Sequence, residues 1–215
     1  PSINFYTKKP YKLKILSVAN DDNTPGFNNF MYTVDKYKLP HKTIGLDSIC
    51  DGQDIKNGTC GGHNTNILKT ELDTWDNTEL NNTIILFTDS YDFFFLENEH
   101  TILKKYFDAL DEYNYSNTVL FASDKCCWPD SSLSHLYTNH HTSSYLYLNA
   151  GSFIGTAINI KKIIYETSLF NTDNAQLFYT QIYLKDKLNI KCQIDYNCCL
   201  FQTLNHSIQD MCLSG

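Results

Sequence analysis

Two acidic side chains, Asp89 and Asp92, come directly after an apolar, β-prone segment at residues 83–88. In an open α/β sheet, ligands bind at the carboxyl ends of the strands. Two carboxylates there repel each other unless a cation lies between them. A divalent ion that also binds a phosphate-bearing ligand accounts for the pair, which predicts a sugar-nucleotide site. The alternative is a helix-capping aspartate beside a solvated one.

Three further side chains could contribute to such a site. Tyr91 lies between the two acids and could stack on a nucleobase or simply pack. Asn149 lies among small residues at 149–152, which would let a sugar approach the backbone closely, although a glycine-containing strand bend explains this run as well. Trp128, directly before Pro129, could stack on a sugar or belong to the core.

The composition limits the possible partners. The 215-residue chain contains 17 lysines, no arginine and a net charge of −7, so nucleic acid is not an expected partner. Without a guanidinium clamp, a bound diphosphate must be neutralised by metal, lysine and backbone amides. No apolar run approaches the ~18 residues of a membrane span, and no charged-then-apolar leader opens the chain.

Compartment and oligomeric state are left open by the composition. The eight cysteines fit two or three disulfides or a set of buried thiols equally well. Abundant Asn, Ile, Lys, Tyr and Phe are typical of an AT-rich genome, such as that of a large DNA virus or a protist.

The elements that must position these side chains alternate along the sequence. Strands are expected at residues 12–19, 42–46, 83–88, 118–122, 145–158 and 193–201, and helices at residues 27–36, 64–75, 97–110, 159–169 and 175–184. This alternation predicts one α/β domain over residues 1–215, a Rossmann-like three-layer sandwich with a mixed, mostly parallel central sheet. Residues 47–62 are expected to form a loop over the ligand.

The chain resembles the glycosyltransferase domain of procollagen lysyl hydroxylases. The resemblance rests on four ordered runs, FTDSYD at 87–92, CWPD at 127–130, LNAGSFIG at 148–155 and QLFYT at 176–180, and covers nearly the whole chain. It implies a GT-A-like fold, Mn²⁺ as cofactor, and retaining transfer of glucose from UDP-glucose to galactosyl-hydroxylysine in collagen. Giant DNA viruses that encode collagens carry members of this family, in agreement with the composition.

The resemblance also implies roles for individual residues. The metal ligands would be Asp89 and Asp92. The UDP-sugar would contact Val18, Asn20, Ile55, Ser90 and Tyr91. The sugar or acceptor would face Asp124 and Trp128, and the residues near the reacting centre would be Asn149, Asp173, Asn174 and Gln176.

The chain departs from the family pattern in three ways. Ala175 stands where the family has an acid before its Gln-Leu-Phe-Tyr run, and Asp173 could substitute for that acid. The family's third metal ligand, a histidine in a C-terminal His-Gly-Asn-Gly run, has no counterpart before Gly215. Asp89, Asp92, phosphates and water would then hold the metal, unless the segment was cut. The sequence contains no hydroxylase domain after these runs, so the resemblance implies a free-standing transferase or an excised domain.

These departures leave alternatives open. One is a degenerate module that holds UDP or collagen without turnover. Another is a transferase that acts directly on hydroxylysine or uses UDP-galactose.

Overall fold

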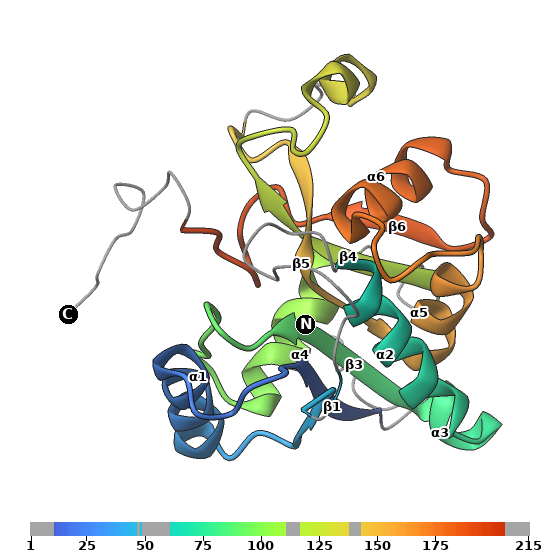
Figure 1. The fold of residues 1–215 in the computed structure, drawn as a ribbon. Coiled ribbons are helices and arrows are strands. Elements are labelled where there is room, and N and C mark those ends of the chain that lie inside the picture. The colour runs from blue at the N-terminus through green and yellow to red at the C-terminus, as the bar shows by residue number, and fades with distance from the viewer. Residues whose placement is uncertain (1–10, 47, 49–60, 111–116, 138–142, 205–215) are drawn as a thin grey trace, which may run out of the picture.

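A six-stranded sheet divides the molecule into three layers (Figure 1). The computed structural model describes residues 11–46, 48, 61–110, 117–137 and 143–204. Its strands are β1 (Lys12–Val18), β2 (His41–Ile44), β3 (Thr83–Asp89), β4 (Thr118–Asp124), β5 (Tyr147–Thr156) and β6 (Lys191–Ile194). The strand order is β2-β1-β3-β5-β4-β6.

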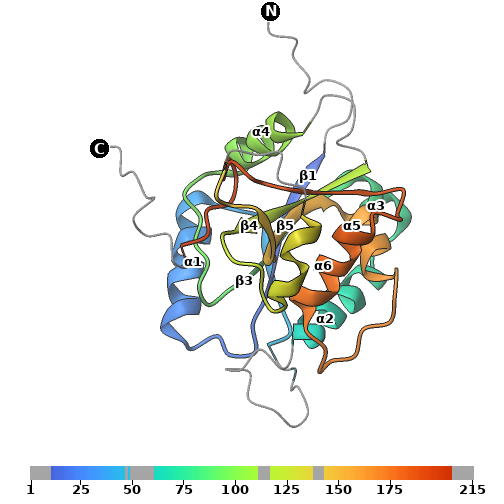
Figure 2. The same ribbon diagram turned by 90° about the horizontal axis from the view of Figure 1, so that it is seen from above.

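Helices cover both faces of this sheet. They are α1 (Pro25–Tyr37), α2 (Gly61–Asp73), α3 (Asn77–Asn82), α4 (Glu99–Ala109), α5 (Ala157–Ile164) and α6 (Ala175–Lys185), with a 3₁₀ helix, η4, at Ser131–Leu136. Figure 2 shows α1 and α4 on one side of the sheet and α2, α5 and α6 on the other. The predicted three-layer α/β sandwich is confirmed.

One strand runs against the other five. β1 pairs in parallel with β2 and β3, and β4 pairs in parallel with β6, whereas β5 is antiparallel to both of its neighbours, β3 and β4. The sheet is therefore mixed and mostly parallel, as expected. Because β3 and β4 end at the same edge, their last residues, Asp89 and Asp124, lie at that edge together with the first half of β5.

The core consists of two separate apolar clusters, one on each face of the sheet. The first packs α2, α5 and α6 against the sheet and includes Leu68, Ile160 and Phe153. The second packs α1 and α4 against the opposite face and includes Phe30 and Tyr106. Strand β3 contributes to both clusters because its successive side chains point to opposite faces.

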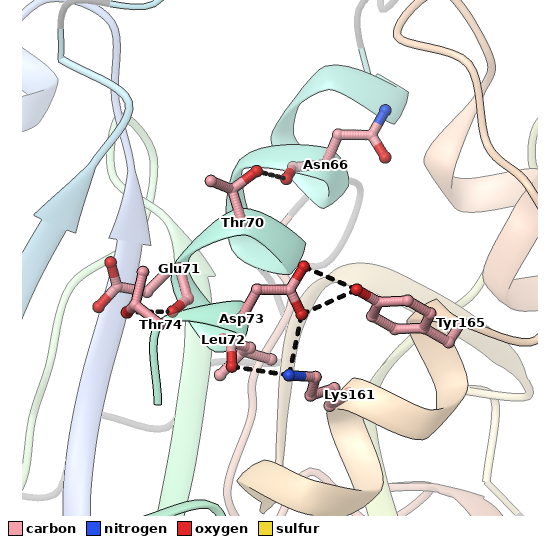
Figure 3. Close-up of polar contacts among 8 residues, drawn as sticks. All are labelled: Asn66, Thr70, Glu71, Leu72, Asp73, Thr74, Lys161 and Tyr165. Carbon is pink, nitrogen blue, oxygen red and sulfur yellow. Dashed lines mark hydrogen bonds and ion pairs between the residues drawn. The ribbon is translucent and has the colours of Figure 1, made fainter. Parts of the chain in front are cut away.

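Helices α2 and α5 are joined by a polar contact at their ends (Figure 3). The Tyr165 hydroxyl lies 2.8 and 2.7 Å from the two carboxylate oxygens of Asp73. Lys161 Nζ lies 2.8 Å from Asp73 Oδ1 and donates to the Leu72 carbonyl at 3.0 Å. The lysine thus donates to a carbonyl in the last turn of α2 that has no partner within the helix. Its positive charge also stabilises the helix, because it lies at the negative end of the helix dipole.

Most expected elements begin and end within three residues of their predicted bounds, whereas two differ more, and the helices α3 and η4 were not expected. The strand expected at 193–201 ends at Ile194, because the Asp195 carboxylate draws the next amides into a turn. Helix α5 starts at Ala157, inside the strand expected at 145–158, and ends at Ile164 rather than at residue 169. The short helix α3, capped by Asp76, was missed. No helix among the described residues is long and apolar enough to cross a membrane.

Candidate functional site

A cavity of about 480 Å³ lies at the edge where β3 and β4 end. Its walls come from the ends of β3 and β4, the first half of β5, and the first turns of α2 and α6. Five of the predicted site residues line it: Asp89, Asp124, Trp128, Asn149 and Gln176. The sheet topology thus brings together side chains that are up to 87 positions apart in the sequence.

Asp89, the last residue of β3, is the most perturbed acid at this edge. Burial, together with a smaller contribution from the negative charge of Asp92, raises the pKa of its carboxyl to about 7. Asp92 itself is exposed on the turn that follows β3. A desolvated carboxylate beside a second acid favours a bound cation, which would restore the charged form of Asp89.

The oxygen donors of this edge suit a hard divalent ion such as Mn²⁺. Among the described residues, no group of three or more His, Cys, Asp or Glu side chains is placed to hold a metal ion. Asp89 and Asp92 would therefore supply two ligands, and phosphate oxygens and water would supply the others. The residues present fit Mn²⁺ if two carboxylates, phosphate oxygens and water together complete its coordination.

The loops after β1 and β3 are held together by Tyr91 and Ser90. The Tyr91 hydroxyl donates to Asn20 Oδ1 at 2.5 Å and accepts from the Asn20 and Asp21 amides at 2.9 Å each. Ser90, which is fully buried, donates from Oγ to the Val18 carbonyl at 2.5 Å. Four residues predicted for the UDP-sugar therefore lie together, and the fifth, Ile55, lies outside the described residues.

Asn149 and Asp124 form a hydrogen-bonded pair across β5 and β4. Asn149 Nδ2 lies 3.4 Å from Asp124 Oδ2, and Asn149 Oδ1 accepts from the Gly151 amide at 2.8 Å. A Cβ atom at Gly151 would lie 3.0 Å from Asn149 Oδ1 and 3.6 Å from Asp89 Oδ2. The glycine thus leaves room between the amide and the carboxylate for a ligand atom.

Gln176 lines the cavity, but its amide group is engaged with the backbone of β5. Nε2 donates to the Leu148 carbonyl at 2.6 Å and to Thr180 Oγ1 at 3.3 Å, while Oε1 accepts from the Ala150 amide at 2.7 Å. Both hydrogens of the amide nitrogen are thereby used within the protein.

The two residues before Ala175 have local structural contacts. Asp173 Oδ2 accepts from the Phe170 amide at 2.7 Å, and Asn174 caps α6 by accepting from the Leu177 amide at 2.8 Å. Neither is among the described residues that line the cavity, whereas Ala175 is. Their predicted part in catalysis stays a prediction.

Sequence reasoning missed the contribution of α2 to the cavity. Asn64 and Thr65, from the first turns of this helix, line the cavity opposite the strand ends. Gly61 and Gly62, expected at the end of the loop over the ligand, instead begin α2, and a Cβ atom at Gly62 would lie 1.9 Å from the Phe170 carbonyl oxygen. Such contact requires glycine, and it brings the start of α2 against the segment that leads into α6.

Comparison with known proteins identifies the family. Residues 9–215 match the family model described as the PLOD GT domain. The chain belongs to this family. It is 31% identical over 206 residues to the multifunctional procollagen lysine hydroxylase and glycosyltransferase LH3 of Rattus norvegicus, covering 95% of this chain and 26% of that protein.

Other relatives of this family show similar identity. The chain is 30% identical to procollagen-lysine,2-oxoglutarate 5-dioxygenase 2 of Homo sapiens, over 94% of this chain and 26% of that protein. It is also 30% identical to the multifunctional procollagen lysine hydroxylase and glycosyltransferase of Caenorhabditis elegans, over 93% of this chain and 27% of that protein. The chain thus spans about a quarter of the length of these relatives. The mixed α/β sheet fits the GT-A-like domain expected of the family.

Proposed function

We propose that this PLOD GT domain transfers glucose from UDP-glucose to galactosyl-hydroxylysine in collagen, with retention of configuration and with the assistance of Mn²⁺. One observation carries the proposal: the desolvated carboxyl of Asp89 faces a cavity at the strand edge, where Asn149 and Asp124 offer hydrogen-bonding groups. Membership of a collagen glycosyltransferase domain family supports the class of reaction.

Each part of the site has a distinct task in this proposal. Asp89 and Asp92 would hold the metal ion, which supplies charge neutralisation for the departing diphosphate. The Tyr91 ring, fixed through its hydroxyl to the loop after β1, would provide a flat surface for uracil. Trp128, at 56% exposure on the cavity rim, would present a face to the sugar or the acceptor.

The protein supplies orientation rather than a strong base in this reaction. For retention, the acceptor hydroxyl attacks from the face that the leaving group occupies, and the departing diphosphate takes its proton. The chain then has to hold the two substrates in contact and exclude water. Asn149 and Asp124 would bind sugar hydroxyls, which is supported by their position on adjacent strands in the wall of the cavity.

The decisive variant is Asp89→Ala. Without this carboxylate the metal loses its buried ligand, so Mn²⁺-dependent release of UDP from UDP-glucose should fall by about 100-fold or more. The rate is measured with and without collagen peptide bearing galactosyl-hydroxylysine. Asp108→Ala is the control, because Asp108 is an exposed acid on α4 whose ion-pair partner is Lys104. Full activity of Asp89→Ala would overturn the assignment.

A second candidate, a module that binds UDP or collagen without turnover, is favoured by Ala175. This residue lines the cavity with a methyl group where family members carry an acid. If the chain is such a module, it binds UDP in the presence of Mn²⁺ but releases no UDP from UDP-glucose. In that case Ala175→Asp should produce measurable turnover, whereas an active wild-type chain rules the module out.

A further inference from the structure

Strand β5 contains a bulge beside the cavity. Its register with β4 passes from Phe121–Phe153 directly to Ala122–Asn149, so residues 150–152 of β5 have no partner residue on β4. On its other side, β5 stays paired with β3 up to Ser152–Thr88. A bulge bends the strand locally and turns a side chain away from its regular direction. The residue at the start of this bulge is Asn149.

The side chain of Gln176 bonds to the part of β5 that lies beyond its last pair with β3, Ser152–Thr88. Its Oε1 accepts from the Ala150 amide at 2.7 Å, and its Nε2 donates to the Leu148 carbonyl at 2.6 Å. These two groups flank Asn149. Backbone groups away from water require partners, and here one carboxamide from α6 satisfies an acceptor before Asn149 and a donor after it.

We propose that Gln176 is a positioning residue that acts on the reaction through Asn149. By fixing the backbone at Leu148 and Ala150, Gln176 fixes the direction of the Asn149 side chain, which bonds to Asp124 and to the Gly151 amide. Gln176 itself does not need to touch the sugar, since both hydrogens of its Nε2 are engaged. This inference rests on the proposed function, because it assigns Asn149 a contact with the bound sugar.

A double-mutant cycle on Gln176→Ala and Asn149→Ala tests the relation between the two residues. Asn149→Ala should lower kcat by about 100-fold, the order that loss of alignment at a reacting centre can cost. Gln176→Ala should lower kcat by about 10-fold or more, because Asn149 remains present but loses its fixed direction. If Gln176 acts only through Asn149, the double variant is no slower than Asn149→Ala alone. If the double variant instead lowers kcat by the product of the two single effects, Gln176 acts independently of Asn149 and the proposal is overturned.

Two control variants separate positioning from a general loss of stability. Thr180→Val removes the 3.3 Å contact to Gln176 Nε2 but keeps both bonds to β5, so its kcat should stay within about twofold of wild type. Asn98→Ala removes the N-cap of α4, which is remote from the cavity. It should lower stability by about 1 kcal/mol and so shows what a stability loss alone does to kcat. A large kcat effect in either control would contradict the proposed path of action.

Hydrogen exchange provides a readout that does not depend on turnover. In ligand-free protein, Gln176→Ala should speed exchange of the Ala150 amide by about 10-fold or more, while amides in the centre of β3 keep their protection. Unchanged exchange at Ala150 would overturn the proposal. If the wild-type chain shows no turnover, the proposed function is contradicted but the role of Gln176 is not. The double-mutant cycle is then repeated with the affinity for UDP-glucose in place of kcat. Failure of the wild type to bind UDP-glucose would overturn both.

Discussion

At the scale of single residues, the proposed role of Asp89 as a metal ligand predicts that metal binding depends on pH. Its carboxyl has a pKa of about 7, so a proton competes with the cation around neutrality. The apparent affinity for Mn²⁺ should therefore decrease as the pH falls below 7, by up to about tenfold per pH unit. Mn²⁺ titrations between pH 6 and 8 measure this slope. Affinity that is constant over that range would contradict a protonated Asp89 in the metal-free protein.

His41 predicts a different pH effect, on folding stability. Burial and, to a smaller extent, the charge of Lys14 lower the pKa of its imidazole from 6.5 to about 4, against an opposing effect of Asp35. Ser17 Oγ lies 2.8 Å from His41 Nε2 on the adjacent strand. Between pH 6.5 and 4 the unfolded chain binds a proton that the folded chain does not. This contribution to stability is therefore complete above pH 6.5 and is lost as the pH falls toward 4.

Thermal unfolding of His41→Gln and wild type at pH 4.5 to 7 measures that contribution. The difference in melting temperature between wild type and variant should shrink as the pH falls. His135→Gln, at an exposed histidine of η4, is the matched control for the substitution itself. An equal difference at every pH would contradict a lowered pKa of His41 in the folded protein, because stability depends on pH only where the two states bind different numbers of protons.

At the scale of elements, the start of α2 depends on Gly62. The Gly62 amide donates to the Asp173 carbonyl at 2.8 Å, and the His63 amide donates to the Asn171 carbonyl at 3.1 Å. A methyl group at Gly62 would lie 1.9 Å from the Phe170 carbonyl oxygen. The resulting displacement should cost about 1–3 kcal/mol, beyond the gain of up to ~1 kcal/mol in helix propensity.

Urea unfolding of Gly62→Ala tests this prediction. The variant should be less stable than wild type, although alanine is the better helix former. Thr70→Ala, on an exposed part of the same helix, should change stability by no more than about 0.5 kcal/mol. A stabilised Gly62→Ala would mean that the loop at 169–174 can move away from α2 without cost.

The sequence predicted those elements whose signal is local. The apolar run before Asp89 and the apolar spacing of α4 and α6 are visible in the sequence, and the structure contains all three elements. The change from β5 to α5 was not visible, because Phe153, Ile154, Ala157 and Ile158 fit both a strand and a helix period.

The site was likewise predictable only where its residues follow from a local sequence pattern. Acids at strand ends follow from the local pattern, so Asp89 and Asp124 could be expected at one edge. The contact between Gln176 and the backbone around Asn149 could not, because it joins residues 26 and 28 positions apart by a side-chain-to-backbone bond. Such a bond leaves no periodicity and no turn composition in the sequence.

At the scale of the whole molecule, Asp195 connects the two halves of the core. Ile194 belongs to the cluster under α2, α5 and α6, whereas Phe201 belongs to the cluster under α1 and α4. Between them the chain passes from one face to the other. The Asp195 carboxylate, 4% exposed, accepts from the amides of Cys199, Leu200 and Phe201 at 2.8–2.9 Å.

Asp195→Ala should destabilise the entire domain. Three backbone donors lose a charged acceptor, and such bonds contribute about 1.5–3 kcal/mol each, so a loss of at least ~3 kcal/mol is expected. Guanidinium unfolding followed by tryptophan fluorescence and by far-UV circular dichroism measures the loss. Coincident transitions at a lower midpoint would confirm that both faces unfold together. Asp108→Ala, on the α4 surface, should leave the midpoint unchanged.

The separation of the core into two clusters has a consequence for how such a domain can change over generations. The described residues that line the cavity include Phe87 and Leu148 of the first cluster but no member of the second. Mutations beneath α1 and α4 can therefore accumulate under selection for stability alone. Mutations beneath α2 and α6 are selected for stability and chemistry at once. Sequence change should accordingly be faster beneath α1 and α4 than beneath α2 and α6.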